Sequence, residues 1–339
     1  MPHDSDVHGV APRAVVIGAG FGGIAAALRA RSLGYDVQLI ERQPTLGGRA
    51  RVFRQDGFTF DAGPTVITAP QLFEELFALF GERMADHVEM LPVRPWYRIL
   101  FSDQRHFDYG STAKEVRAAV VAFAPDDADG YDRFMRRSQA LFEIGFNKYG
   151  AQPSDTLSSM ARALPGLLRL GGLQSVSSLV RGFIRDESLR RVFSLQPLLL
   201  GGHPFRTSGI YSLIPYLEQR WGVWFPRGGT GALVSALEKL MIRTGIQVQT
   251  GCTVSRIRIR DGRAAGVDLD DGTTVSADIV IANADAPQVH AVLQPISAPR
   301  RPFAPPHEFM RRLDWGSCGG VLITFCPDDM SCPCRASCC

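Results

Sequence analysis

The sequence has few of the features that identify a secreted, membrane-spanning or nucleic-acid-binding protein. Its 339 residues carry a formal net charge of only +3, without a basic patch interleaved with aromatic residues, so we expect no nucleic-acid partner. No uninterrupted apolar run reaches the ~18 residues of a membrane-spanning helix. Residues 1–12 lack the basic start and apolar stretch of a secretory signal, so we expect a cytoplasmic protein with a loose leader.

Cysteine is nearly absent from the body of the chain, where only Cys252 occurs. The others crowd the end, at Cys318, Cys326, Cys332, Cys334, Cys338 and Cys339. A metal or disulfide knot is one interpretation, but no histidine accompanies these cysteines and two separated Cys-x-x-Cys pairs are missing. We therefore expect no metal site, and we interpret residues 326–339 as an anomalous tail, a truncated or frame-shifted end.

What the chain does have is a globular composition, 45% hydrophobic, and a glycine-rich segment, VVIGAGFGGIAAALRA, at residues 15–30. A short apolar run at 14–17, the glycines and the alanine-rich stretch predict a strand, a tight turn and a helix. Gly18 permits the turn, Gly20 lets the backbone approach a pyrophosphate, and Gly23 lets helix and strand pack closely. A second strand is predicted at 36–40. It ends at Glu41, about 20 residues after the glycines, where a carboxylate can accept a ribose hydroxyl.

The next segment, at 42–69, predicts further contacts with this dinucleotide. Gly47, Gly48 and Arg49 suit a second approach to a pyrophosphate, because an arginine fork binds oxyanions beside a bare backbone. A solvated loop is the alternative. Alternating residues on both sides of Asp56-Gly57 predict a hairpin, which leads into a tight loop at 61–65. Gly63 and Pro64 would fix that loop, and its small residues would let a flat ring lie against it.

From about residue 71 to 220 the apolar spacing is mostly helical. The stretch 157–183 contains Arg162, Arg169 and Arg181 and no acidic residue, which suits a segment lying on an anionic membrane surface. A buried helix pair with exposed arginines is the alternative. Six aromatic residues between 205 and 225 fill a core or line an apolar pocket, with core the default: Phe205, Tyr211, Tyr216, Trp221, Trp224 and Phe225.

The last interpretable section returns to α/β character. A helix is predicted at 232–243, and strands at 247–250, 254–260, 264–269 and 279–282. Asn283 follows the last of these strands, where ligands contact open α/β sheets. Residues 13–70 and 226–325 would therefore form one discontinuous domain, interrupted by a substrate-binding and membrane-associating region at 71–225.

Four segments carry a family resemblance: IGAGFGGIAAALRARSLGYDVQLIER, LGGRARVFRQDGFTFDAGPTVITAP, FPRGGTGALVSALEKL and ADIVIANAD. Over about residues 13–325 the chain resembles the bacterial phytoene desaturases of the FAD-dependent carotenoid desaturase family. The resemblance implies an α/β fold of the two-dinucleotide-binding flavoprotein type, a FAD-binding Rossmann-like domain with a helical insertion. It also implies FAD, a flavin ring near Gly63, and an adenine contact from the backbone of Val254. The resulting cofactor-binding set is Gly18, Gly20, Gly23, Glu41, Arg42, Gly47, Gly48, Arg49, Asp61, Ala62, Gly63, Pro64, Thr65, Val254 and Asn283.

By this resemblance the reaction is the desaturation of phytoene, with a hydride passing to the flavin and a proton leaving. Such an apolar substrate implies a peripheral association with the membrane that dissolves it, and a quinone or oxygen as electron acceptor. No catalytic residue is assigned, since the spacing does not separate catalysis by Asp61 from cofactor holding. The alternatives are a flavin-dependent amine or porphyrinogen oxidase of the same fold, a non-catalytic isoprenoid-binding protein, and an inactive truncated chain.

Overall fold

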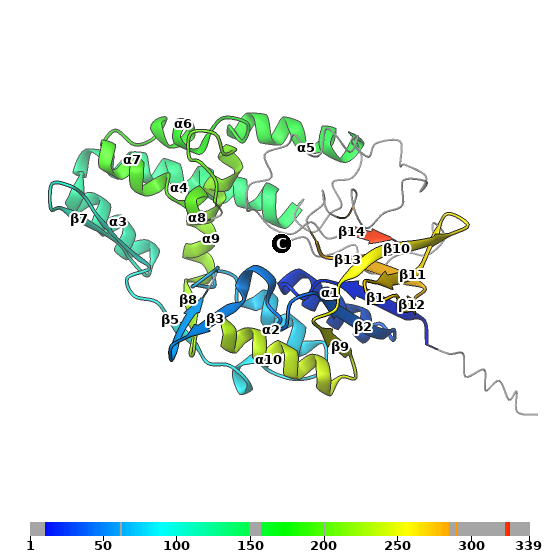
Figure 1. Cartoon of the computed structure of the whole chain (residues 1–339). Coiled ribbons are helices and arrows are strands. Elements are labelled where there is room, and N and C mark those ends of the chain that lie inside the picture. The colour runs from blue at the N-terminus through cyan, green and yellow to red at the C-terminus, as the bar shows by residue number, and fades with distance from the viewer. Residues whose placement is uncertain are drawn as a thin grey trace, which may run out of the picture.

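The computed structural model describes residues 11–61, 63–148, 157–199, 201–284, 289 and 323–325. Its central element is a five-stranded sheet with the order β14-β13-β1-β2-β9 (Figure 1). Four of these strands are parallel, and β14 pairs antiparallel with β13. The strands are β1 (Arg13–Ile17), β2 (Asp36–Glu41), β9 (Gln247–Thr250), β13 (Ile279–Ala282) and β14 (Ile323–Phe325). This parallel sheet confirms the predicted α/β class.

The central strands are apolar on both faces because both faces are covered, as parallel strands require. Helices α1 (Phe21–Ser32) and α10 (Thr230–Arg243) pack against one face, where Val16 lies in their common core. Val15, the preceding residue of the strand, packs on the other face against a three-stranded antiparallel sheet. The strands of that sheet are β10 (Val254–Arg260), β11 (Arg263–Leu269) and β12 (Thr274–Ser276).

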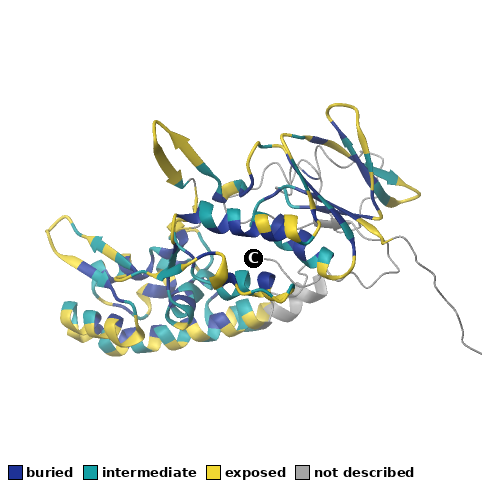
Figure 2. Ribbon diagram, turned by 90° about the horizontal axis from the view of Figure 1, so that it is seen from below, coloured by how far each residue is buried: buried dark blue, intermediate teal, exposed yellow. Residues whose placement is uncertain are grey.

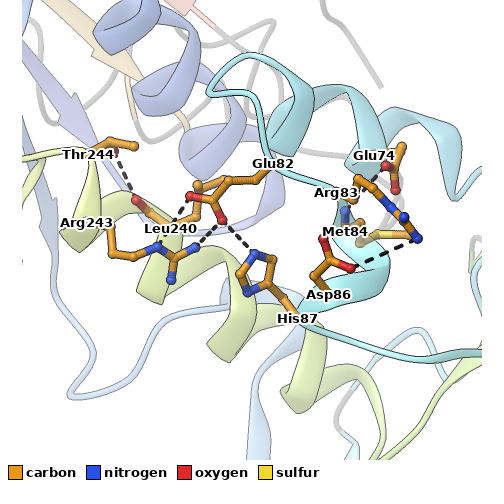
Figure 3. Close-up of polar contacts among 9 residues, drawn as sticks. All are labelled: Glu74, Glu82, Arg83, Met84, Asp86, His87, Leu240, Arg243 and Thr244. Atoms are coloured by element: carbon orange, nitrogen blue, oxygen red, sulfur yellow. Dashed lines mark hydrogen bonds and ion pairs between the residues drawn. The ribbon is translucent and has the colours of Figure 1, made fainter.

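Between β2 and the helical region the chain makes a short 3-10 turn, η1 (Gly48–Ala50), and the predicted hairpin of β3 (Val52–Gln55) and β4 (Phe58–Asp61). Helix α2 (Gln71–Ala78) and the turn η2 (Met84–Asp86) follow, and their apolar side chains belong to the core of the first layer. An ionic contact also holds this segment there (Figure 3). Glu82 accepts from Arg243 of α10 at 2.5 Å and lies 2.6 Å from His87.

The region that follows has a core of its own, rich in aromatic rings such as Phe107, Tyr109, Phe134 and Phe193. Its helices lie to one side of the central sheet (Figure 1), and buried residues run through their interior (Figure 2). They are α3 (Ala113–Phe123), α4 (Ala128–Phe142), α5 (Leu157–Leu170), α6 (Val176–Arg181), α7 (Glu187–Phe193), α8 (Gln196–Leu199) and α9 (Ile214–Trp221). The short turns are η3 (Pro125–Asp127), the π-helix η4 (Glu143–Lys148) and η5 (Gly209–Leu213).

This region is less purely helical than its sequence predicts. A hairpin of β6 (Tyr97–Leu100) and β7 (His106–Tyr109) lies against α3, and β5 (Met90–Pro92) pairs with β8 (Trp224–Pro226). These strands are only three or four residues long. A strand of three or four residues has too few positions to show an alternating apolar pattern. The partner of β5 also lies far along the chain, so the local sequence does not predict the pairing.

Candidate dinucleotide-binding site

The glycine-rich loop lies at the carboxyl ends of three parallel strands, β13, β1 and β2. Gly18 donates its N–H to the carbonyl of Ile40 at 2.8 Å, and Asn283 donates its N–H to the carbonyl of Ile17 at 2.8 Å. Gly18 has φ of +93°, a backbone conformation that a side chain would strain. The chain therefore makes the strand-turn-helix that the sequence predicts, at the edge where open α/β sheets bind ligands.

Helix α1 begins at this loop with its backbone donors uncapped. Its N-cap is Gly20, no side chain caps the helix, and no acidic residue lies in the first turn. A Cβ added to Gly23 would lie 1.9 Å from the carbonyl oxygen of Gly18, so only glycine allows the helix to pack this closely. An uncapped helix start with a positive dipole end and a bare backbone is suited to an anion such as a pyrophosphate.

Asn283 lies against the same turn from the neighbouring strand. A Cβ on Gly22 would be 2.7 Å from its Oδ1, and a Cβ on Gly20 would be 3.3 Å from its Nδ2. The structure thus brings the residue after β13 into contact with the glycine loop, although the two are more than 250 positions apart in the sequence.

Glu41 is buried, with 6% of its surface exposed, and supports the loop directly. One carboxylate oxygen accepts the N–H of Ala19 at 2.7 Å, and the other accepts the N–H of Gln43 at 2.9 Å. Each oxygen has a further lone pair for a ribose hydroxyl. The carboxylate therefore fixes the loop before any ligand arrives, a role that the sequence pattern did not suggest. Arg42, beside it, is exposed.

The second glycine pair lies beside the first. Gly47 donates to the carbonyl of Ala19 at 2.8 Å and forms a bridge with Gly20. A Cβ on Gly48 would be 3.0 Å from the Cα of Gly20, so the two backbones touch. Arg49 follows and is exposed. The backbone of residues 47–48 therefore lies against the glycine loop, as a second approach to the ligand requires, and the role of residues 47–49 stays a prediction.

The loop after the hairpin is tied to α10. The carboxylate of Asp61 lies at the first turn of that helix, 3.4 Å from the N–H of Thr230, and the Thr230 hydroxyl donates to the carbonyl of Pro64. A Cβ on Gly63 would lie 2.0 Å from the carbonyl oxygen of Arg49, so this loop packs on the 47–49 segment. Gly63, Pro64 and Thr65 are exposed, and Ala62 lies outside the described residues.

Thr230 anchors a loop of the candidate site, and reasoning from the sequence did not single it out. It is fully buried, and both its N–H and its hydroxyl hold the 61–65 loop. The segment FPRGGTGAL was part of the family resemblance, and the threonine after its glycines was the available signal. Asp61 therefore has a capping role at α10, since a carboxylate at a helix N-terminus is favourable.

Val254 lies at the start of β10, next to the end of β2. Cys252 donates its N–H to the carbonyl of Glu41 at 3.0 Å, which brings this strand to the edge of the site. The Val254 side chain is buried in the core between the two sheets, so the predicted adenine contact would have to come from its backbone. Among the residues that the structure describes, no group of histidine, cysteine and acidic residues could hold a metal ion.

These observations define a class of protein. A parallel sheet, an uncapped helix start at the carboxyl ends of its strands, a second glycine pair in contact with the first and a buried glutamate on the next strand form a dinucleotide-binding cradle of the flavoprotein type. The chain belongs to the family of flavin-containing amine oxidoreductases, which it matches over residues 21–327. The fit of the cradle agrees with FAD, the cofactor that the sequence predicts and that this family implies.

Curated relatives support the resemblance predicted from the sequence. The chain is 46% identical over 273 residues to a lycopene-forming phytoene desaturase of Pseudescherichia vulneris, covering 80% of this chain and 56% of that protein. It is also 46% identical over 270 residues to the lycopene-forming phytoene desaturase of Pantoea ananas, covering 80% of this chain and 55% of that one. The chain thus spans a little over half the length of the relatives it matches.

A solved structure of a putrescine oxidase double mutant matches with a TM-score of 0.60 and 16% identity, covering 86% of this chain and 62% of that one. A likeness at this low identity establishes the fold alone. It agrees with the predicted α/β fold.

Proposed function

We propose that the chain takes part in the FAD-dependent desaturation of phytoene, in which one carbon loses a hydride to the flavin, the adjacent carbon loses a proton, and a double bond forms between them. The observation that carries the proposal is the combination of the dinucleotide cradle with 46% identity to lycopene-forming phytoene desaturases. FAD, when bound, supplies the hydride acceptor. A quinone or oxygen would reoxidise it.

The residues of this chain hold the cofactor. In this proposal the α1 N-terminus with Gly18 and Gly20 binds the pyrophosphate, and Glu41 accepts the ribose hydroxyls through its remaining lone pairs. Arg49 and the 47–48 backbone, which touches the glycine loop, approach the same pyrophosphate. The exposed loop at 63–65, anchored through Thr230, supports the flavin ring.

Because phytoene dissolves in the membrane, we further propose that the helical region binds a membrane surface. Leu164, Leu168, Leu173 and Phe205 are all large apolar residues with 43–64% of their surface exposed. The segments that carry Leu173 and Phe205 are joined by a hydrogen bond from Val176 N–H to Thr207 O at 3.0 Å. A core position was the default expectation for Phe205 from the sequence, whereas the structure exposes its side chain.

Two exposed arginines, Arg169 and Arg181, flank this apolar surface, while the side chain of Arg162 lies outside the described residues. α5 and α6 lie on the far side of the helical region from the central sheet (Figure 1). Within the described part of the chain, no helix has both the length and the apolar character needed to cross a bilayer. Apolar side chains beside arginines suit binding to the face of an anionic membrane.

The first experiment measures flavin retention and then turnover. The purified chain is mixed with FAD, desalted, and its absorbance spectrum recorded, and phytoene in anionic vesicles is then supplied with a quinone. Retained flavin and a coloured polyene product support the proposal. Retained flavin with oxidation of an amine but not of phytoene would instead favour an amine oxidase, and a colourless protein would contradict FAD binding by this chain.

A matched pair of glycine variants tests the cradle itself. In Gly48→Ala the new methyl group meets the Gly20 backbone at 3.0 Å, whereas in Gly262→Ala it meets nothing within 4 Å. Both glycines have positive φ, +56° and +76°, so the backbone strain is similar. We expect Gly48→Ala to weaken FAD retention by about tenfold or more, and Gly262→Ala to retain it. Equal retention would refute the assignment of Gly48.

Membrane binding has its own test, by flotation with vesicles. Leu168→Ser combined with Leu173→Ser is expected to reduce binding to phosphatidylglycerol vesicles. Leu100→Ser, which alters an apolar residue with 74% exposure on β6, serves as the control. If the double variant floats like the unaltered chain, the membrane surface is placed wrongly.

A further inference from the structure

The hairpin of β3 and β4 exposes the face that a folded protein ordinarily buries. Phe53 pairs directly with Phe60 across the hairpin, and Phe58 lies two residues from Phe60, so all three rings share one face. The exposed fractions are 49% for Phe53, 55% for Phe60 and 67% for Phe58. Figure 2 draws the hairpin in the exposed colour over most of its length.

The opposite face is the polar one, and its base is the part in contact with the protein. Val52 lies under α10, where a Cβ on Gly231 would meet its Cγ2 at 2.6 Å, and Asp61 lies at the first turn of the same helix. The other members of this face are Arg54 and Thr59. Arg54 and Thr59 are exposed as well, so the hairpin is held at its base and both of its faces are accessible further out. Three large aromatic side chains gathered on one accessible face indicate that a partner covers the rings.

Each strand of the hairpin also has an open edge. Within the described residues β3 and β4 pair only with each other, as a two-stranded sheet. A two-stranded hairpin is marginally stable by itself, and unpaired edges accept a further strand. An open edge beside an apolar face fits a β-strand or β-sheet surface of another stretch of polypeptide.

We propose that the aromatic face of this hairpin, Phe53, Phe58 and Phe60, docks a β-sheet surface of the polypeptide that makes up the rest of the length of the phytoene desaturase relatives. The chain matches about 55% of those relatives, so a large further stretch exists in them to supply such a surface. The inference rests on this family relationship and does not depend on desaturation.

A lipid surface fits the hairpin less well. Lipid offers no hydrogen bonds to the open strand edges, and such edges do not occur in the hydrocarbon region. The turn of the hairpin also carries Asp56, held at φ of +52°, whose carboxylate opposes insertion tip first into an anionic membrane.

Docking here has a consequence for the cofactor site. The hairpin begins just after the 47–49 segment and ends at Asp61, so it joins the two segments that approach the ligand. A sheet packed on its aromatic face restricts the hairpin and, through it, both segments. Flavin retention should therefore rise when the partner polypeptide is present.

Co-expression tests the proposal without any assay of desaturation. The full chain is produced with the part of the Pseudescherichia vulneris relative that the match does not cover, which carries an affinity tag, and capture of the chain is quantified. We expect capture, and a loss of about tenfold or more in Phe53→Ser/Phe60→Ser. Phe205→Ser, which removes another ring that is 64% exposed, is the control and should be captured normally.

A covalent chimera guards against a fragment that fails to fold. The chain is fused to the same stretch of the relative, and hydrogen exchange of the 52–61 amides is compared with that in the chain alone. Exchange slowed in the chimera, and restored by Phe53→Ser/Phe60→Ser, supports the proposal. Unchanged exchange would overturn the proposal. Flotation with vesicles that depends on the hairpin would also overturn it, because it indicates a membrane contact. Self-association that depends on the hairpin would overturn it as well, because it indicates a second copy of the chain.

Discussion

Glu41 in the nucleotide-binding core and Glu218 in the helical core are both buried carboxyl groups, with 6% and 0% of their surface exposed. Both oxygens of Glu41 accept backbone N–H groups, from Ala19 and Gln43. Glu218 accepts one hydrogen bond, from the Tyr97 hydroxyl at 2.9 Å, and its Oε2 has no partner among the described residues. Burial raises the pKa of Glu218 to about 7, although the Tyr97 hydrogen bond acts in the opposite direction.

The surroundings explain the difference. Glu41 lies at the end of a strand, where the turn of the glycine loop offers free backbone donors. Glu218 lies within α9, whose amides are used in the helix, and it faces tyrosines on β6 and β7. The Tyr109 hydroxyl there is also buried and has no partner among the described residues, and burial together with Glu218 raises its pKa well above the usual value. Buried carboxyl groups therefore stabilise a fold only where donors are already arranged for them.

Removal of the Glu41 carboxylate should have the largest effect. In Glu41→Ala the amides of Ala19 and Gln43 lose their acceptor inside the protein, so we expect a loss of roughly 3 kcal/mol in the free energy of unfolding. Glu41→Gln keeps one acceptor oxygen and should lose about half as much. Urea denaturation followed by circular dichroism measures both. A loss in Glu41→Ala no larger than that in Glu41→Gln would contradict the assigned role.

Glu218→Gln should stabilise the protein at alkaline pH. The folded carboxyl has a pKa of about 7 against an ordinary glutamate value of 4.5, so the folded state binds the proton more tightly. Stability then falls as pH rises from about 4.5 to 7, by up to about 3 kcal/mol, and is constant above. Glu218→Gln should remove this decline, and its free energy of unfolding should exceed that of the unaltered chain at pH 8.

Urea denaturation at a series of pH values measures this effect. Glu187→Gln, which alters a glutamate on α7 with a side chain 75% exposed, is the control and should leave the decline unchanged. A parallel pH profile in Glu218→Gln and the unaltered chain would show that Glu218 does not titrate in this range.

Substitution of the two tyrosines beside Glu218 should change the stability differently. Tyr97→Phe removes the hydroxyl that donates to the carboxylate and should cost about 1 kcal/mol or more at pH 8. Tyr109→Phe removes a buried hydroxyl without a partner in the described part of the chain and should be neutral or stabilise by up to about 1 kcal/mol. Thermal or urea denaturation of both variants gives the comparison. Losses of the same size in both would indicate that Tyr109 has a partner, for example a buried water.

Of the three carboxyl groups, Glu82 should have the smallest effect, because it is partly exposed whereas the other two are buried. Its hydrogen bond from Arg243 lowers its pKa, with His87 contributing as well. The contact stabilises the fold above the ordinary glutamate pKa of 4.5, and this contribution is lost as pH falls through the lower folded value. Glu82→Gln should cost less than about 1 kcal/mol at pH 7, and the difference should disappear in acid. Urea denaturation at pH 7 and in acid measures both values, and a difference that persists in acid would contradict the ionic role.

Much of the nucleotide-binding half was predictable from the sequence, because its signals are local. The glycines, the apolar strands and the Asp56-Gly57 turn each identify their own element, and the strands at 247–250, 254–260 and 279–282 have the predicted bounds. Contacts over long separations were not predictable. The short pairing of β5 with β8 and the placement of Asp61 at the start of α10 join residues more than 130 positions apart.

Consecutive residues were enough to identify a dinucleotide-binding α/β protein related to the phytoene desaturases, since glycine spacing and strand hydrophobicity are local properties of the chain. What those residues contact depends on the folded arrangement. In the folded chain Glu41 accepts two backbone amides, whereas Glu218 accepts one hydroxyl among the described residues. The 61–65 loop is bonded to Thr230, and three phenylalanines of one hairpin are exposed. Burial and hydrogen-bond partners arise from segments that meet only in the tertiary structure.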